Sequence, residues 1–74
     1  MKANTKLDFN QQYAWSMIVR TDTVGQEHWG TYKARYVGET VADAMEAIRQ
    51  NCASKMGAPL HVVTVFKFTF AKQG

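Results

Sequence analysis

The sequence predicts a small α+β domain in the order strand, strand, helix, strand, with a three-stranded antiparallel sheet and the helix packed on one face. Three observations support this prediction. Residues 40–57 have the spacing and capping signals of one amphipathic helix, two alternating apolar runs precede it, and a phenylalanine-rich alternating run follows it. A chain of 74 residues with one cysteine has room for one core and no internal disulfide. We therefore expect a single domain over residues 13–72.

Residues 40–57 contain the signals for both ends of a helix. Thr40 is a suitable N-cap, and Asp43 completes a capping box that satisfies backbone N–H groups of the first turn. Gly57 favours the left-handed conformation that ends a helix, and Pro59 prevents its continuation. Apolar side chains recur between these ends at steps of three and four residues, which predicts a buried stripe made of Val41, Ala44, Met45, Ile48 and Cys52.

Two runs of alternating polarity precede this helix. Residues 13–21 predict a first strand whose core face carries Tyr13, Trp15, Met17 and Val19. The polar residues 22–28, centred on Gly25, predict a long hairpin loop. Residues 29–37 then predict a second strand, with an inward face formed by Tyr32, Ala34 and Tyr36.

The two ends of the chain differ in apolar content. Residues 1–12 are mostly polar, so we expect a flexible, loosely held arm. Residues 60–71 predict a long strand, and because its phenylalanines are spaced at twos we expect it at the centre of the sheet. The face of this strand toward the helix is predicted to carry Val62, Thr64, Phe66, Phe68 and Phe70.

A basic sheet face opposite the helix is the main functional feature that the sequence predicts. The alternation places four cations there, Arg20, Lys33, Arg35 and Lys67, interleaved with Ile18, Val63 and Val65. Trp29 has the same parity, so its indole is expected to be a stacking platform or an anchor for a protein partner, with a cover over the hairpin as the alternative. One helix cannot cover both faces of a sheet, so this face is free for an acidic protein surface or a phosphate backbone. The alternative is that these charges only keep the domain soluble.

The sequence contains no catalytic or metal-binding signature. His28 lies beside Glu27 in the predicted loop without a nucleophile, and His61 and Cys52 lack the spacing of a metal site. Cys52 falls on the apolar stripe, where a thiol behaves as a small hydrophobe. We therefore expect no enzymatic activity, no cofactor and no metal. With no signal-like run in residues 1–12 and no segment suited to a membrane, we expect a cytoplasmic protein that is a monomer when free.

Residues 39–48, Glu-Thr-Val-Ala-Asp-Ala-Met-Glu-Ala-Ile, carry a resemblance to a known family. With the strand order and chain length, they resemble the small phage-encoded inhibitors and regulators of host bacterial RNA polymerase, such as those of T-odd coliphages and of a phage that infects Xanthomonas. The resemblance covers residues 15–69 in topology. It implies docking on the largest polymerase subunit and interference with sigma factor or promoter engagement. Basic residues on the last strand matter for docking in the coliphage protein, and here Lys67 lies in the matching place.

The leading hypothesis is therefore a small phage protein that binds host RNA polymerase through Arg20, Trp29, Lys33, Arg35 and Lys67. One alternative is a nucleic-acid-binding module that uses the same basic face, and another is a small phage protein that inhibits some other host enzyme. The net charge of +3 permits contact with nucleic acid without requiring it. A further alternative is a homodimer formed through an exposed edge strand.

Overall fold

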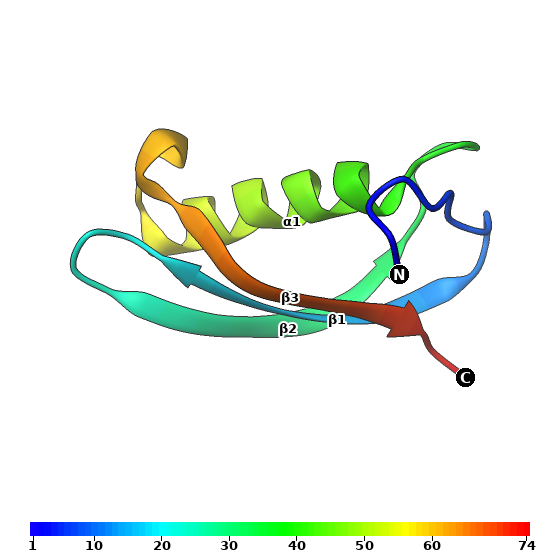
Figure 1. Cartoon of the computed structure of the whole chain (residues 1–74), viewed down its shortest axis with the longest axis horizontal. Coiled ribbons are helices and arrows are strands. Elements are labelled where there is room, and N and C mark those ends of the chain that lie inside the picture. Colours follow the sequence, from blue (N-terminus) through cyan, green and yellow to red (C-terminus); the bar gives the residue numbers. More distant parts are fainter.

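Three strands and one helix follow one another in the predicted order. The computed structural model describes residues 1–74. It contains the strands β1 (Gln12–Arg20) and β2 (Gly25–Lys33), the helix α1 (Val41–Met56), a 3₁₀ turn η1 (Leu60–Val62) and the strand β3 (Thr64–Lys72). Both strand pairs are antiparallel. The α+β class and the β-β-α-β order are therefore confirmed (Figure 1).

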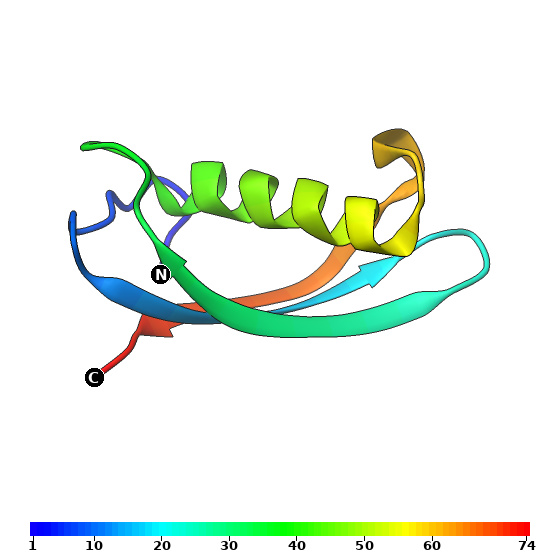
Figure 2. The same ribbon diagram turned by 180° about the vertical axis from the view of Figure 1, so that it is seen from behind.

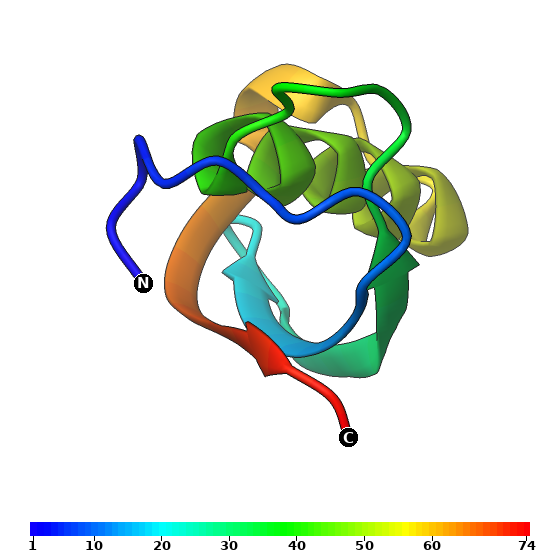
Figure 3. The ribbon, with the colours of Figure 1, turned by 90° about the vertical axis from the view of Figure 1, so that its right-hand side faces the viewer.

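The helix α1 covers one face of a curved sheet. Figures 2 and 3 show the strands bending around α1 on one side and leaving their other side uncovered. The strand order is β2-β1-β3, so the prediction that the last strand lies at the centre is wrong. The central strand β1 contributes Tyr13, Met17 and Val19, each at most 1% exposed. An apolar strand gains most from burial when it is paired on both sides.

Both predicted ends of α1 are confirmed. The Thr40 side chain accepts a hydrogen bond from the Asp43 backbone N–H, and the Asp43 carboxylate accepts one from the Thr40 N–H. Gly57 has a left-handed φ of 67° and closes the last turn. The buried face of the helix follows the predicted stripe closely, with Met45 only half-buried and Ala53 added, and consists of Val41, Ala44, Ile48, Cys52 and Ala53.

The hairpin between β1 and β2 is shorter than the sequence predicts. A turn over residues 21–24 is closed by a bond from the Thr21 N–H to the Val24 carbonyl, 2.8 Å, and β2 begins at Gly25. The predicted loop over 22–28 and strand over 29–37 are therefore wrong by about four residues. Pairing with the apolar β1 draws the polar residues 25–28 into the sheet despite their weak β-propensity.

The strand β3 contains a bulge that changes which side chains face α1. Ile18 pairs with Lys67 but Val19 pairs with Val65, so Phe66 has no partner of its own on β1. Before the bulge, Val63 is buried on the helix side; after it, Phe68 and Phe70 are the residues that pack there. Val63 and Val65 were predicted to lie on the face opposite the helix, but both pack on the helix side. Thr64 and Phe66 were predicted to face the helix, but both lie on the opposite face. The prediction assumed a regular alternation, which the bulge interrupts.

Residues 1–12, for which a flexible arm was predicted, pack against the domain. Leu7 is buried, and its N–H donates to the Glu39 carbonyl over 2.8 Å. The N–H groups of Val41 and Ala42 donate to the carbonyls of Thr5 and Ala3, which satisfies first-turn donors of α1. A single large apolar side chain and the helix terminus therefore hold a polar segment in place.

The helix α1 is the longest in the chain, and it is neither long nor apolar enough to cross a lipid bilayer.

Two phenylalanines on β3 test the bulge. Phe70 is buried and stacks on Tyr13 with ring centroids 4.8 Å apart, whereas Phe66 is 65% exposed. We expect Phe70→Ala to lower the free energy of unfolding by about 3 kcal/mol or more, and Phe66→Ala to lower it by less than about 1 kcal/mol. Urea denaturation followed by circular dichroism measures both. Equal losses for the two variants would contradict the register described above.

Candidate functional site

The surface of the sheet opposite α1, called the open face below, combines cations with exposed apolar groups. Cross-strand partners project from the same side of a sheet, so the register identifies its members. By this pairing the open face consists of Gln12, Ala14, Ser16, Ile18, Arg20, Gly25, Glu27, Trp29, Thr31, Lys33, Thr64, Lys67, Thr69 and Ala71. The unpaired Phe66 joins them, because its ring lies against the Arg20 guanidinium. The open face spans all three strands and carries three cations and one carboxylate.

Trp29 is the largest exposed apolar group of the open face. It lies on β2 opposite Ser16, and its side chain is 74% exposed, as the alternation predicts. The other tryptophan, Trp15, faces the helix side and lies against Gly30, where an added Cβ would come within 3.1 Å of the indole. The glycine therefore leaves room for Trp15 beneath β2, while Trp29 is free to contact a partner.

The three cations of the open face lie along the sheet and do not form one cluster. Lys33 pairs with Gln12 at one end of β1, Arg20 is at the other end opposite Gly25, and Lys67 lies opposite Ile18. Nearly the whole length of β1, roughly 25 Å, separates Lys33 from Arg20. None of the three takes part in an ion pair. The arrangement suits a broad acidic surface better than a single small anion.

Arg35 does not belong to the open face, contrary to the prediction. The strand β2 ends at Lys33, and Arg35 lies in the connection to α1. Its guanidinium forms an ion pair with the Glu39 carboxylate, with Nη2 2.8 Å and Nε 2.9 Å from the same oxygen, Oε2. Its positive charge is therefore neutralised within the domain.

The Glu39 carboxylate is the one buried charge of the structure and joins three segments. It accepts hydrogen bonds from the Tyr32 hydroxyl at the end of β2 and from the Arg35 backbone N–H, 2.6 Å away, while the Glu39 carbonyl binds the Leu7 N–H. Burial alone would raise the pKa of Glu39, but the hydrogen bonds from Arg35 and Tyr32 outweigh it and hold the pKa below its usual value. Burial and the bond to Glu39 raise the pKa of Tyr32. No sequence signal singled out Glu39, because the Tyr32, Arg35 and Leu7 groups that bind it come from separate segments.

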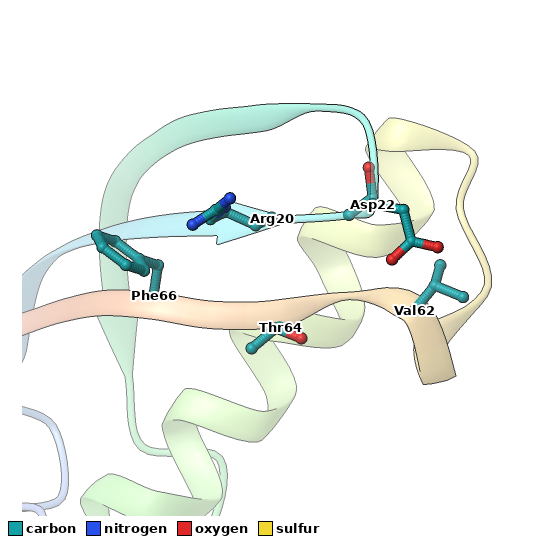
Figure 4. Close-up of a pocket in the computed structure, with 6 residues that line it drawn as sticks. Arg20, Asp22, Val62, Thr64 and Phe66 are labelled. Atoms are coloured by element: carbon teal, nitrogen blue, oxygen red, sulfur yellow. The ribbon is translucent and has the colours of Figure 1, made fainter.

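A pocket of about 360 Å³ opens at the end of the sheet near the β1–β2 hairpin (Figure 4). Its lining comes from the end of β1, the hairpin, η1 and the start of β3, and consists of Arg20, Thr21, Asp22, Val62, Thr64 and Phe66. The Arg20 guanidinium lies over the Phe66 ring, 5.5 Å from its centroid. The sequence did not reveal this pocket because regular alternation assigned Phe66 to the core.

The remaining chemically active side chains lie apart from the open face. Cys52 is buried on α1, as predicted, and burial raises the pKa of its thiol. His28 faces the helix side opposite Met17, and its Nε2 is buried without a hydrogen-bond partner. His61 lies exposed in η1. No three His, Cys, Asp or Glu side chains gather where they would hold a metal ion.

In comparisons with protein-family models, curated proteins and solved structures, nothing matches this chain.

The Glu39 network gives the domain an acid-sensitive anchor. Because the folded pKa of Glu39 lies below its unfolded value of about 4.5, its stabilising effect is present above that pH and is lost as the pH falls through the folded pKa. We expect Glu39→Gln to be less stable than the wild type by about 2 kcal/mol near neutral pH, and the difference to shrink below about pH 4. Urea denaturation at stepped pH measures this. A difference that is constant with pH would contradict the role assigned to the ionised carboxylate.

Proposed function

We propose that this chain is a small non-enzymatic phage protein that docks on host bacterial RNA polymerase and inhibits or redirects transcription. The observation that carries the docking is the open face, where an exposed Trp29 lies among cations that have no partner within the domain. The choice of polymerase, with its largest subunit as the favoured contact, rests on the resemblance of residues 39–48 and of the strand order to the phage inhibitors. Interference with sigma factor or promoter engagement is the mechanism that this resemblance implies.

The chemistry of the open face supports a protein partner of acidic character. Trp29 offers the large, rigid apolar contact that often dominates binding energy, and the half-buried Ile18 lies near it on β1. Lys33 and Lys67 on the flanking strands complement carboxylates and increase the rate of encounter. The domain acts as a binding surface in this proposal, so the protein works as a monomer without a cofactor in the cytoplasm of the infected host.

Substitution of Trp29 tests the proposal. We expect the wild-type protein to bind purified bacterial RNA polymerase at low salt, and Trp29→Ala to weaken this binding by at least about tenfold, because the lost contact lies at the centre of the interface. Biolayer interferometry with immobilised polymerase gives the dissociation constants. Trp29 is exposed, so the variant should retain the stability of the wild type.

Lys55→Ala is the matched control for the charged residues. Lys55 lies exposed in the last turn of α1, on the opposite side of the domain, whereas Lys67 lies on the open face. Lys67→Ala should weaken polymerase binding by about two- to tenfold and Lys55→Ala should leave it unchanged. Absence of binding by the wild type at low salt would refute polymerase as the partner. Equal effects of the two lysine variants would refute the open face as the docking surface.

The exposure of Phe66 favours a second candidate function, binding of single-stranded nucleic acid. Bases stack on exposed aromatic rings of a sheet while nearby cations contact the phosphates. The open face offers two such rings, Trp29 and Phe66, with Lys67 between them in the register of the strands. The sequence had placed Phe66 in the core, so only Trp29 was expected there.

A gel-shift assay with single-stranded oligonucleotides tests this second candidate. It requires binding that weakens steeply with added salt, and losses of about five- to a hundredfold for Trp29→Ala and for Phe66→Ala, because each removes one stacking platform. Ser54→Ala, a change on the exposed surface of α1, is the control. Oligonucleotide binding that is absent at low salt, or that is indifferent to both aromatic residues, would reject the candidate.

A further inference from the structure

The pocket beside the hairpin holds two opposite charges that do not neutralise each other. Arg20 and Asp22 both line it, yet neither takes part in any ion pair of the structure. In Figure 4 the Arg20 guanidinium extends toward the Phe66 ring, and the Asp22 carboxylate is turned toward Val62. A cation and an anion two residues apart are therefore both available to a ligand.

Phe66 contacts the Arg20 side chain within the pocket lining. The Arg20 guanidinium lies 5.5 Å from the centroid of the Phe66 ring, which is close enough for a cation–π interaction. An exposed cation–π contact contributes about as much as an exposed ion pair, so the ring is a partner for the guanidinium at this end of the sheet. The bulge in β3 places Phe66 on this side of the sheet, where its ring forms part of the lining.

The dimensions of the pocket suit an extended peptide segment. Its volume of about 360 Å³ is at the lower end of the range for ligand sites, and it is open to solvent. Arg20 ends β1 and Asp22 lies in the turn that follows, so the pocket presents a cation and a carboxylate from neighbouring parts of the chain. Side chains at alternate positions of an extended segment project to the same side, so two of them can face the pocket together. Val62 and Phe66 add an apolar wall, and Thr64 adds a hydroxyl.

We propose that this pocket binds an extended segment of a partner protein that carries a carboxylate side chain and, two residues away, a lysine or arginine. The carboxylate pairs with the Arg20 guanidinium, and the partner's cation pairs with the Asp22 carboxylate. Charge complementarity to both residues selects this occupant over a purely acidic segment, which Asp22 repels. This pocket adds a specific contact to the proposed docking function. It depends on that function only in that the bound segment belongs to the docking partner.

Short peptides test the pocket without a known partner. We expect N-acetyl-Glu-Val-Lys-amide, or its reverse-order counterpart, to give saturable amide shifts at residues 20–22 and 62–66 in nuclear magnetic resonance titrations up to about 10 mM. Replacing either the Glu or the Lys of the peptide by Gln should weaken binding by about twofold or more, because each change removes one exposed ion pair.

Three variants distinguish this pocket from general attraction to a basic protein. Arg20→Gln and Asp22→Asn should each weaken peptide binding, and Phe66→Leu should weaken it because the Arg20 guanidinium loses the aromatic ring against which it lies. Lys6→Gln, which removes an exposed cation beside the start of α1, should leave peptide binding unchanged. Saturable shifts absent from the pocket residues, an Asp22→Asn variant that binds as well as the wild type, or an equal loss in Lys6→Gln would each overturn the inference.

The two proposals fail in separable ways. Polymerase binding by the wild-type protein decides the proposed function, whereas the peptide titration decides the occupant of the pocket. A protein that binds the Glu-Val-Lys peptide but not polymerase would refute polymerase as the partner and retain the pocket. A protein that binds polymerase but gives no pocket shifts with any of the peptides would refute the occupant of the pocket and retain polymerase as the partner.

Discussion

The β-bulge opposite Ile18 and Val19 is the constraint on which the rest of the structure depends. With one helix, only one face of the sheet can be buried, and β3 has to bend around that helix. The bulge produces the bend and changes the alternation, so Val63 packs inward before it and Phe68 and Phe70 pack inward after it. The cost of this arrangement is that Phe66 is left exposed. That ring then holds Arg20, which connects the geometry of the core with the chemistry of the open face.

The helix was predictable from the sequence because its signals are local. Thr40, Asp43 and Gly57 act within one turn of the helix ends, and the apolar stripe lies within the helix itself. The burial pattern of β1 was predictable for the same reason, since its alternation is regular from Tyr13 to Val19. The positions of Trp29, Lys33 and Lys67 on the open face follow from the alternation of side chains along a strand. The error of about four residues in the predicted ends of β2 leaves this alternation unchanged.

The features that the sequence did not predict depend on contacts between distant segments. The start of β2 is determined by pairing with β1, and the bulge in β3 is a feature of its pairing with β1, a strand more than forty residues earlier in the chain. Leu7 lies in a mostly polar segment, and Arg35 was assigned to the second strand. Both residues are held against the domain by contacts with Glu39. The pocket likewise depends on distant segments, because its walls come from β1, the hairpin, η1 and β3. The pattern of alternating polarity could therefore not predict that Arg20 and Asp22 line one pocket.

The distribution of ion pairs separates structural charges from charges that are available for binding. Arg35, Arg49 and Lys72 each pair with a carboxylate of the same domain, and Arg49 also binds the carbonyls of Leu60 and Val63 after α1. The cations of the open face have no such partners. The net positive charge of +3 is mild, and three of the cations without an ion pair lie along the face of the sheet that the helix leaves uncovered. These three charges are available to a partner.

The central claim, that the bulge turns Phe66 toward Arg20 and away from the helix, is tested most directly by nuclear Overhauser effects from the Phe66 ring. The account predicts contacts from this ring to the side-chain protons of Arg20 and none to the methyl groups of Ile48 on α1. Contacts from the Phe66 ring to Ile48, together with a Phe68 ring that shows contacts only to solvent-exposed neighbours, would contradict it.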